Sequence, residues 1–495
     1  MSGVLNVVEM SAGVLSLSGH GPGPDGLGVT TEADAGSFTL RRTALRARPV
    51  YFRITRGRLE WGASLAAFLP PGGRVELQPG ALLALVHGQV PPPDASPIAG
   101  VRRLTYGTSV RVDASGVTVS SVPPQLPAPR DVRTALREAL AGVGEEYLIA
   151  CSGGLASTAL SVVAAEAGHD ALPVHADFGL PGLGTPRAMP PGTALRTVSV
   201  DPYELADHHF VSGEELLPPV PDFLMPRRLH DKLAADFGLP VVSGALLASS
   251  VAVKLPDVPR GRRSWRLLTC EPFHLSGTLG SLSEAVELLD NRVVYTPGRR
   301  PADGGADSQQ VGAPPPPSPT GGSKLGWLTE QGRQAYETAH RGSMAVWQDQ
   351  LDSHEAVIGR VMAGLEEQGT DGAELPAADP GVLAATALPS RSLGDIRRGR
   401  FRNHLPLRRI VAAAGVDDVP TSTPGHWLRL CAANHLYRER AKLVAELTQE
   451  CALGDLGLVD PNAVTADFED GRALSAKALP LLRLVWLDRW LKERS

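Results

Sequence analysis

The first 120 residues contain short apolar segments separated by turn sequences, a pattern typical of β-strands. Turns are predicted at Arg56-Gly57 and Pro70-Pro71-Gly72, where glycine and proline interrupt regular structure. A short helix is expected at Pro79–Leu85, because proline suits the first turn of a helix. We therefore predict a small β-rich domain over residues 1–122. Its expected strands are Gly13–Ser18, Ser37–Arg41, Val50–Thr55, Leu59–Gly62 and Val110–Val112.

Residues 123–145 predict a hinge followed by one helix. The hinge is the proline-rich segment Pro123–Pro129, and Asp131 is suited to cap the helix that follows it. The apolar residues of this helix recur at i, i+4 and i+8, the spacing of one helix face. They are Val132, Leu136 and Leu140.

From Tyr147 the pattern changes to short apolar strands that alternate with helices. Such alternation predicts a parallel sheet with helices on both faces, so residues 146–296 are expected to form an α/β domain. The predicted strands and helices are Tyr147–Cys151, Leu155–Glu166, Ala171–His175, Leu195–Val200, Asp222–Phe237 and Pro240–Ser243.

The remaining chain predicts an insertion and then helices. Residues 297–324 are too rich in proline, glycine and serine to bury a core, so we interpret them as a disordered insertion. Residues 325–495 show helical periodicity and are expected to pack as helices around the sheet. The helical segments are Leu328–Gln368, Arg391–Ala414, Gly425–Glu450 and Leu479–Lys492.

Composition and charge narrow the classes of protein. The chain has 495 residues, 43% of them hydrophobic and 20% charged, and a formal net charge of −5. It has ample material for a core, and it lacks the basic excess that would favour a nucleic-acid partner. The four cysteines are far apart, which predicts neither a zinc site nor a disulfide framework. We find no signal-peptide pattern and no apolar run long enough to cross a bilayer, so we expect a cytoplasmic protein.

The segment that carries chemistry runs from Ala150 to Thr158, where a buried strand gives way to a helix. The turn Ser152-Gly153-Gly154 allows several backbone N–H groups to converge at a helix N-terminus, which favours phosphate or pyrophosphate. The hydroxyls of Ser152, Ser157 and Thr158 are candidate additional donors. The alternative interpretation is that the two glycines only make a tight turn.

This segment resembles a known phosphate loop. The run Ser152-Gly153-Gly154-Leu155-Ala156-Ser157 is similar to the pyrophosphate loop Ser-Gly-Gly-x-Asp-Ser of the asparagine synthetase family, which includes β-lactam synthetases and lasso-peptide cyclases. The resemblance implies a truncated glutaminase-like (Ntn-type) domain, then a pyrophosphate-loop domain of the adenine nucleotide α-hydrolase type. It also implies ATP and Mg²⁺ as cofactors and a peptide or a related biosynthetic enzyme as partner. Further ordered similarities lie at Arg48–Phe52, Leu59–Ser64, Gly88–Pro92, Gly100–Leu104, Leu456–Pro461, Val485–Leu487 and Trp490–Leu491. The last three of these segments resemble the C-terminal part of actinobacterial lasso-peptide cyclases in particular.

The acids that the family uses to hold Mg²⁺ are missing. The loop aspartate position is Ala156, and the second motif, Ser-Gly-x-Gly-x-Asp-Glu in the family, begins with Ser243 and Gly244 but continues without acids to Ser249. Hard divalent cations need oxygen ligands, usually carboxylates. We therefore expect no metal-ligating residue here and impaired adenylation.

Other family features are also missing. We interpret the segment that supplies a catalytic lysine in the family as deleted between Asp418 and Gly425. Lys442 is the nearest replacement, and the charged residues around it predict a solvated helix face. Ser2 stands where glutamine-dependent members have cysteine, so ammonia from glutamine is not expected. We assign no catalytic residue.

Three further groups have plain structural explanations. Asp207, His208 and His209 are adjacent in sequence, so their side chains point in different directions and do not suit one metal. Cys151 is expected to be a buried strand-end residue rather than an activated thiol. The basic residues Arg397, Arg398, Arg400 and Arg402 suit a solvated helix face, or else a site for an acidic peptide or phosphate.

Two functional hypotheses follow from these residues. In the first, the protein is a non-catalytic binding or scaffolding partner in peptide natural-product biosynthesis. In the second, it is an active ATP-dependent amide ligase or macrolactam-forming cyclase, in which another carboxylate such as Asp177 holds Mg²⁺. The two differ in whether an acid lies beside the loop.

Overall fold

The structure is a computed structural model of the chain. It describes residues 6–11, 14–19, 29–34, 36–43, 50–55, 58–63, 65–68, 76–87, 96–121, 126–180, 189, 193–207, 220–245, 247, 326–339, 373–385, 405–416, 419 and 426–493. Within them the protein is a mixed α/β structure with three sheets, one of them parallel. No helix in this part of the chain is both long and apolar enough to cross a membrane.

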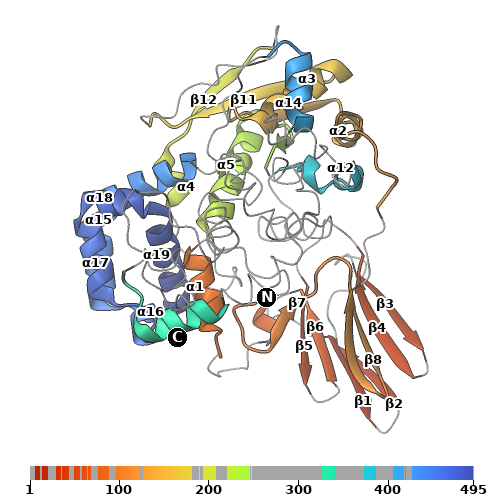
Figure 1. The fold of residues 1–495 in the computed structure, drawn as a ribbon, viewed down its shortest axis with the longest axis vertical. Helices are drawn as coiled ribbons and strands as arrows, with labels where there is room; N and C mark the ends of the chain where they lie inside the picture. The colour runs from red at the N-terminus through yellow and green to blue at the C-terminus, as the bar shows by residue number, and fades with distance from the viewer. Residues whose placement is uncertain are drawn as a thin grey trace, which may run out of the picture.

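The N-terminal part consists of two antiparallel sheets that face each other (Figure 1). One sheet has the order β2-β1-β6-β5-β7 and the other β3-β4-β8-β9. Their facing side chains, such as Leu40, Phe52 and Val110, form one core, which confirms the β-rich character predicted for this region. The strands are β1 (Asn6–Ser11), β2 (Val14–Gly19), β3 (Val29–Asp34), β4 (Ser37–Arg42), β5 (Tyr51–Thr55), β6 (Arg58–Gly62), β7 (Val101–Arg103), β8 (Thr108–Asp113) and β9 (Gly116–Ser121).

The helix predicted near residue 79 is α1 (Pro79–His87), and it does not join the core of the two sheets. Its residues Leu82, Leu83 and Val86 lie in the same core as the C-terminal helices. A short 3-10 turn, Leu65–Phe68, precedes it. Helix α1 therefore connects the N-terminal sheets with the C-terminal part of the chain.

The second part is a parallel sheet with the strand order β12-β11-β10-β13. The chain runs outward from β10 through β11 to β12 and then returns to the other side of β10 as β13, which makes the gap between β10 and β13 a topological switch point. In open α/β sheets, ligands bind beyond the carboxyl ends of the strands at such a point. The strands are β10 (Glu146–Ala150), β11 (Asp170–Asp177), β12 (Arg196–Ser199) and β13 (Val241–Ser243), and all are confirmed within two residues.

Helices cover both faces of this sheet, as predicted. One face packs against α2 (Val132–Ala141), α3 (Leu155–Ala167), α12 (Pro380–Ala385) and α14 (Leu405–Ala413). The other face shares its core with α5 (Pro221–Phe237) and with the C-terminal helices. A short helix, α4 (Pro202–Ala206), follows β12.

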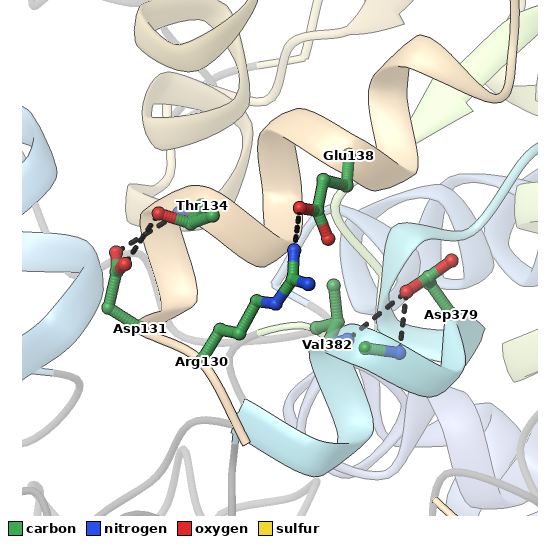
Figure 2. Close-up of polar contacts among 7 residues, drawn as sticks. Arg130, Asp131, Thr134, Glu138, Asp379 and Val382 are labelled. Carbon is green, nitrogen blue, oxygen red and sulfur yellow. Dashed lines mark hydrogen bonds and ion pairs between the residues drawn. The ribbon is translucent and has the colours of Figure 1, made fainter. Parts of the chain in front are cut away.

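Two of these helices begin at capping aspartates (Figure 2). Asp131 accepts a hydrogen bond from the backbone N–H of Thr134 at 3.0 Å, as the sequence predicts. Asp379 accepts from the N–H groups of Gly381, at 2.8 Å, and Val382, at 3.2 Å. Each cap satisfies N–H groups that the first turn of a helix leaves without an intrahelical partner.

The C-terminal part is helical in the residues described, as predicted. Its helices pack beside α1 and α5 (Figure 1). Arg483 of α19 donates two hydrogen bonds, each 2.6 Å long, to the carboxylate of Asp222 in α5, and these bonds join the two helices. The predicted insertion 297–324 lies outside the described residues. The helical elements are 330–339, Pro376–Ala378 (3-10), α15 (His426–Gln449), α16 (Ala452–Asp455), α17 (Pro461–Glu469), α18 (Gly471–Ala476) and α19 (Ala478–Lys492).

Candidate functional site

The candidate site is the loop that leaves the carboxyl end of β10. The N–H of Cys151 still donates to the carbonyl of Val174 at 2.7 Å, as in a parallel ladder, and the chain then turns away from the sheet. Gly153 has φ +73°, a left-handed conformation that glycine adopts without the steric cost borne by other residues. Gly154 is the N-cap of α3 and has no side chain to offer.

The first turn of α3 presents backbone N–H groups rather than side chains. The first intrahelical bond runs from the N–H of Thr158 to the carbonyl of Gly154, at 3.1 Å. The N–H groups of Leu155, Ala156 and Ser157 precede it and therefore have no acceptor within the helix. Together with the helix dipole, such groups attract an anion. The N–H of Gly154 is partly satisfied by Ser152 Oγ at 3.3 Å.

The hydroxyls of Ser157 and Thr158 have a different use from the one expected. Ser157 Oγ donates to the carbonyl of Gly154 at 3.1 Å, and Thr158 Oγ1 donates to the same carbonyl at 3.0 Å. Both side chains are buried. In this conformation Ser157 can offer an anion only its backbone N–H. Thr158 offers neither group, because its N–H and its hydroxyl both donate to the carbonyl of Gly154. Ser152 remains exposed.

The second motif lies directly beside the loop. Ser243, the last residue of β13, pairs with Ala150 of β10, so both motifs start at the same edge of the sheet. A Cβ atom placed on Gly244 would lie 3.0 Å from the Cβ of Ala156 and 3.1 Å from the backbone nitrogen of Ser157. The two sequence-predicted segments are therefore in contact, with a glycine at the closest approach.

No carboxylate occupies the positions where the acids were expected. Ala156 presents a methyl group to Gly244, and Leu247 is fully buried in the core behind α3; Ala248 and Ser249 lie outside the described residues. Asp177, the alternative acid, is exposed at the end of β11, and its Oδ1 accepts the N–H of Gly179 at 2.9 Å. Within the described ranges there is no group of three or more His, Cys, Asp or Glu residues arranged to hold a metal. The residues seen at this site do not fit Mg²⁺.

Cys151 is a buried residue at the start of the loop, in agreement with the structural interpretation. Burial raises the pKa of its thiol above the ordinary value, an effect that the hydrogen bonds of Gly153 and Ser157 only partly offset. Its Sγ atom lies 3.6 Å from Met189 Sδ. A thiol with a raised pKa is a poor nucleophile at neutral pH.

Two side chains beside the loop were not singled out from the sequence. His175 of β11 is buried, with Nδ1 at 3.0 Å from the carbonyl oxygen of Cys151. Phe178, just after β11, stacks on Trp427 of α15 with ring centroids 5.3 Å apart and planes at 2°. The only sequence signal for His175 is a polar residue within an otherwise apolar strand.

The other candidates do not join this site in the described residues. Lys442 lies on the exposed side of α15, where its Nζ is 3.4 Å from Glu439, as expected for a solvated face. Asp207 follows α4. The remaining candidates, Ser2, His208, His209 and the four arginines between 397 and 402, lie outside the described residues.

Comparison with protein-family models gives no match for this chain, and comparison with curated proteins gives no significant relative.

Proposed function

We propose that this protein is a non-catalytic relative of asparagine synthetases and lasso-peptide cyclases that binds the phosphate groups of a nucleotide without turning it over. In this proposal the N-terminal sheets are a truncated glutaminase-like domain, and the parallel sheet is a pyrophosphate-loop domain with a helical C-terminal elaboration. The phosphate-binding residues in this proposal are Ser152, Gly153, Gly154 and Ser157, with Ser243 and Gly244 as the remnant of the second motif. Thr158, also expected there from the sequence, supports the turn instead, because its N–H and its hydroxyl both donate to the carbonyl of Gly154. ATP is the expected ligand.

The contact between Gly244 and Ala156 carries the proposal. It supports the identification of both motifs, because segments far apart in sequence meet at the switch point of the sheet, where nucleotides bind in open α/β proteins. At that contact the loop offers a methyl group where the family has a carboxylate. A methyl group cannot ligate Mg²⁺, and among the described residues of the loop the charge of a polyphosphate would then be met by backbone amides and the hydroxyl of Ser152.

The biological role in this proposal is binding or scaffolding within peptide natural-product biosynthesis in the cytoplasm. The partner would be a peptide substrate or a related biosynthetic enzyme, and neither nucleic acid nor a membrane is involved. The buried Cys151 and the exposed, ion-paired Lys442 support this role, because neither has the environment of a catalytic nucleophile or of a cation held against a reacting group.

An active ATP-dependent amide ligase, independent of glutamine, is the second candidate function. It is favoured by one observation, the exposed carboxylate of Asp177 at the carboxyl end of β11. Its Oδ1 accepts the N–H of Gly179, and the remaining lone pairs of the two oxygens could ligate a metal.

ATP–pyrophosphate exchange separates the two functions. The purified protein is incubated with ATP, excess Mg²⁺, labelled pyrophosphate and candidate carboxylate substrates, beside the variants Ala156→Asp and Asp177→Asn. We expect no exchange above background in any of them, because a single restored acid lacks its partners in the second motif. Exchange in the unmodified protein that Asp177→Asn abolishes would replace our proposal with the ligase.

A further inference from the structure

His175 makes a contact with the phosphate loop that nothing in the loop sequence requires. It lies on β11 with 9% of its surface exposed. Its neighbour Val174 belongs to the core on the face of the sheet that carries α5. Because side chains alternate along a strand, His175 projects to the opposite face, where α3 packs over β10 and β11.

The hydrogen bond made by His175 fixes both its tautomer and the first peptide group of the loop. A carbonyl oxygen can only accept, so the Nδ1 that lies 3.0 Å from the oxygen of Cys151 must carry the proton. The peptide bond between Cys151 and Ser152 is planar, with C=O and N–H in opposite directions. Holding the carbonyl therefore also sets the direction of the Ser152 N–H, the first amide of the loop.

The residues that follow depend on this starting direction. Gly153 reverses the chain with φ +73°, and Gly154 then returns to an extended conformation, φ −81° and ψ 164°, as the N-cap of α3. These two glycines restrict the backbone less than any other residue type. A loop with two adjacent glycines is held more firmly in one conformation when a residue outside the loop bonds to it. Among the described contacts, His175 of the neighbouring strand β11 makes such a bond.

We propose that His175 is a positioning residue of the phosphate loop, acting through the hydrogen bond from its Nδ1–H to the carbonyl of Cys151. Its effect on a nucleotide rests on the proposed function of the loop. Its effect on the conformation of the loop does not, so the two are tested separately.

The variants His175→Asn and His175→Gln distinguish positioning from simple packing. The amide nitrogen of asparagine reaches the place of Nδ1, whereas that of glutamine reaches the place of Nε2. In titrations with metal-free ATP, we expect His175→Gln to weaken binding about tenfold and His175→Asn to remain within about threefold of the unmodified protein. His169→Gln is the matched control. Its Nδ1 bonds to Tyr147 Oη at 3.0 Å just before the other end of β11, about 20 Å away along the strand, and it should leave binding unchanged.

Hydrogen exchange of the backbone amides of residues 152–157, measured without nucleotide, tests the anchor directly. We expect exchange about tenfold faster in His175→Gln, and also in His175→Phe if the glutamine variant does not fold, with His175→Asn similar to the unmodified protein. Exchange in α19 reports on global folding. If the unmodified protein binds no ATP, the proposed function fails while the exchange result still decides the role of His175. Equal exchange in His175→Asn and His175→Gln, whether fast or slow, would overturn the positioning role.

Discussion

Ser157 and Thr158 show that a hydroxyl side chain can bond to the backbone of its own helix instead of to a ligand. Both donate to the carbonyl of Gly154, a bond that residues of this type commonly make within helices. The sequence shows that hydroxyls are present but not which rotamers they adopt. The sequence therefore predicts that these residues lie at the loop, but it does not predict the direction of their side chains. His175 was missed for a related reason, because its partner is a backbone carbonyl, which no sequence motif reveals.

Gly244→Ala tests the close approach of the two motifs. The added Cβ would lie 3.0 to 3.2 Å from atoms of Ala156 and Ser157, so the first turn of α3 must shift. We expect a loss of about 1 to 2 kcal/mol in the free energy of unfolding and weaker binding of ATP. The control Gly326→Ala, where nothing lies within 4 Å of the new atom, should change stability by less than about 0.5 kcal/mol. Equal effects of the two substitutions would contradict the contact.

His435 of α15 should make the protein sensitive to acid. Burial lowers its pKa to about 4, with Asp207 and Glu439 opposing this shift and Arg489 and Lys442 adding to it. The unfolded chain binds a proton near pH 6.5, so this contribution to stability is complete above pH 6.5 and is lost as the pH falls toward 4. It amounts to about 3 kcal/mol. Urea unfolding at pH 7.5 and pH 5 should show a smaller pH effect in His435→Phe than in the unmodified protein. An identical effect would show that His435 is not the cause.

Helices and strands that are buried on both faces were predictable to within a residue or two. The strands β10, β11 and β13 are apolar runs between turn signals, and their parallel pairing follows from the intervening helices. Strands β1, β3, β7 and β9 were missed. Of these, β3, β7 and β9 lie at the edges of their sheets, and β3 and β9 carry few apolar residues. An edge strand with one exposed face leaves little periodic signal.

Asp131 and Asp379 should stabilise the two helices that they begin, α2 and α12, which share a core with α3. Replacing either residue with alanine removes the cap shown in Figure 2. We expect a loss of about 1 kcal/mol in the free energy of unfolding for each, measured by urea denaturation. Asp131→Ser retains a capping oxygen and should recover most of this loss. An alanine variant as stable as the unmodified protein would refute the role of that cap.

The way in which the parts are joined could not be read from the chain. The sequence pattern assigns α1 to the β-rich region, but the apolar face of α1 packs with Trp327, Tyr336 and α19. Gly80 allows this approach, because a Cβ there would lie 2.6 Å from the Cβ of Ala339. Long-range packing of this kind depends on the shape of both surfaces, and a hydrophobic pattern does not specify which surface its apolar face will meet.

Gly332 should be essential for the C-terminal assembly. A Cβ at this position would lie 2.0 Å from the carbonyl oxygen of Leu458, which is backbone and cannot move aside cheaply. We expect Gly332→Ala to cost at least about 2 kcal/mol in the free energy of unfolding and to lower the thermal midpoint seen by circular dichroism. Gly326→Ala, a few residues earlier in the chain, serves again as control. An unchanged midpoint in Gly332→Ala would show that this segment does not pack against residue 458.

The central claim is that the loop has the backbone N–H groups of a phosphate-binding site but lacks the carboxylates that would bind a metal ion. Calorimetric titration with ATP in EDTA, and again with excess Mg²⁺, measures this directly. Because the described site offers N–H groups and no carboxylate, we predict that ATP binds without metal and that Mg²⁺ leaves the affinity unchanged or weakens it. Absence of binding in both titrations, or binding at least tenfold tighter with Mg²⁺, would contradict the account.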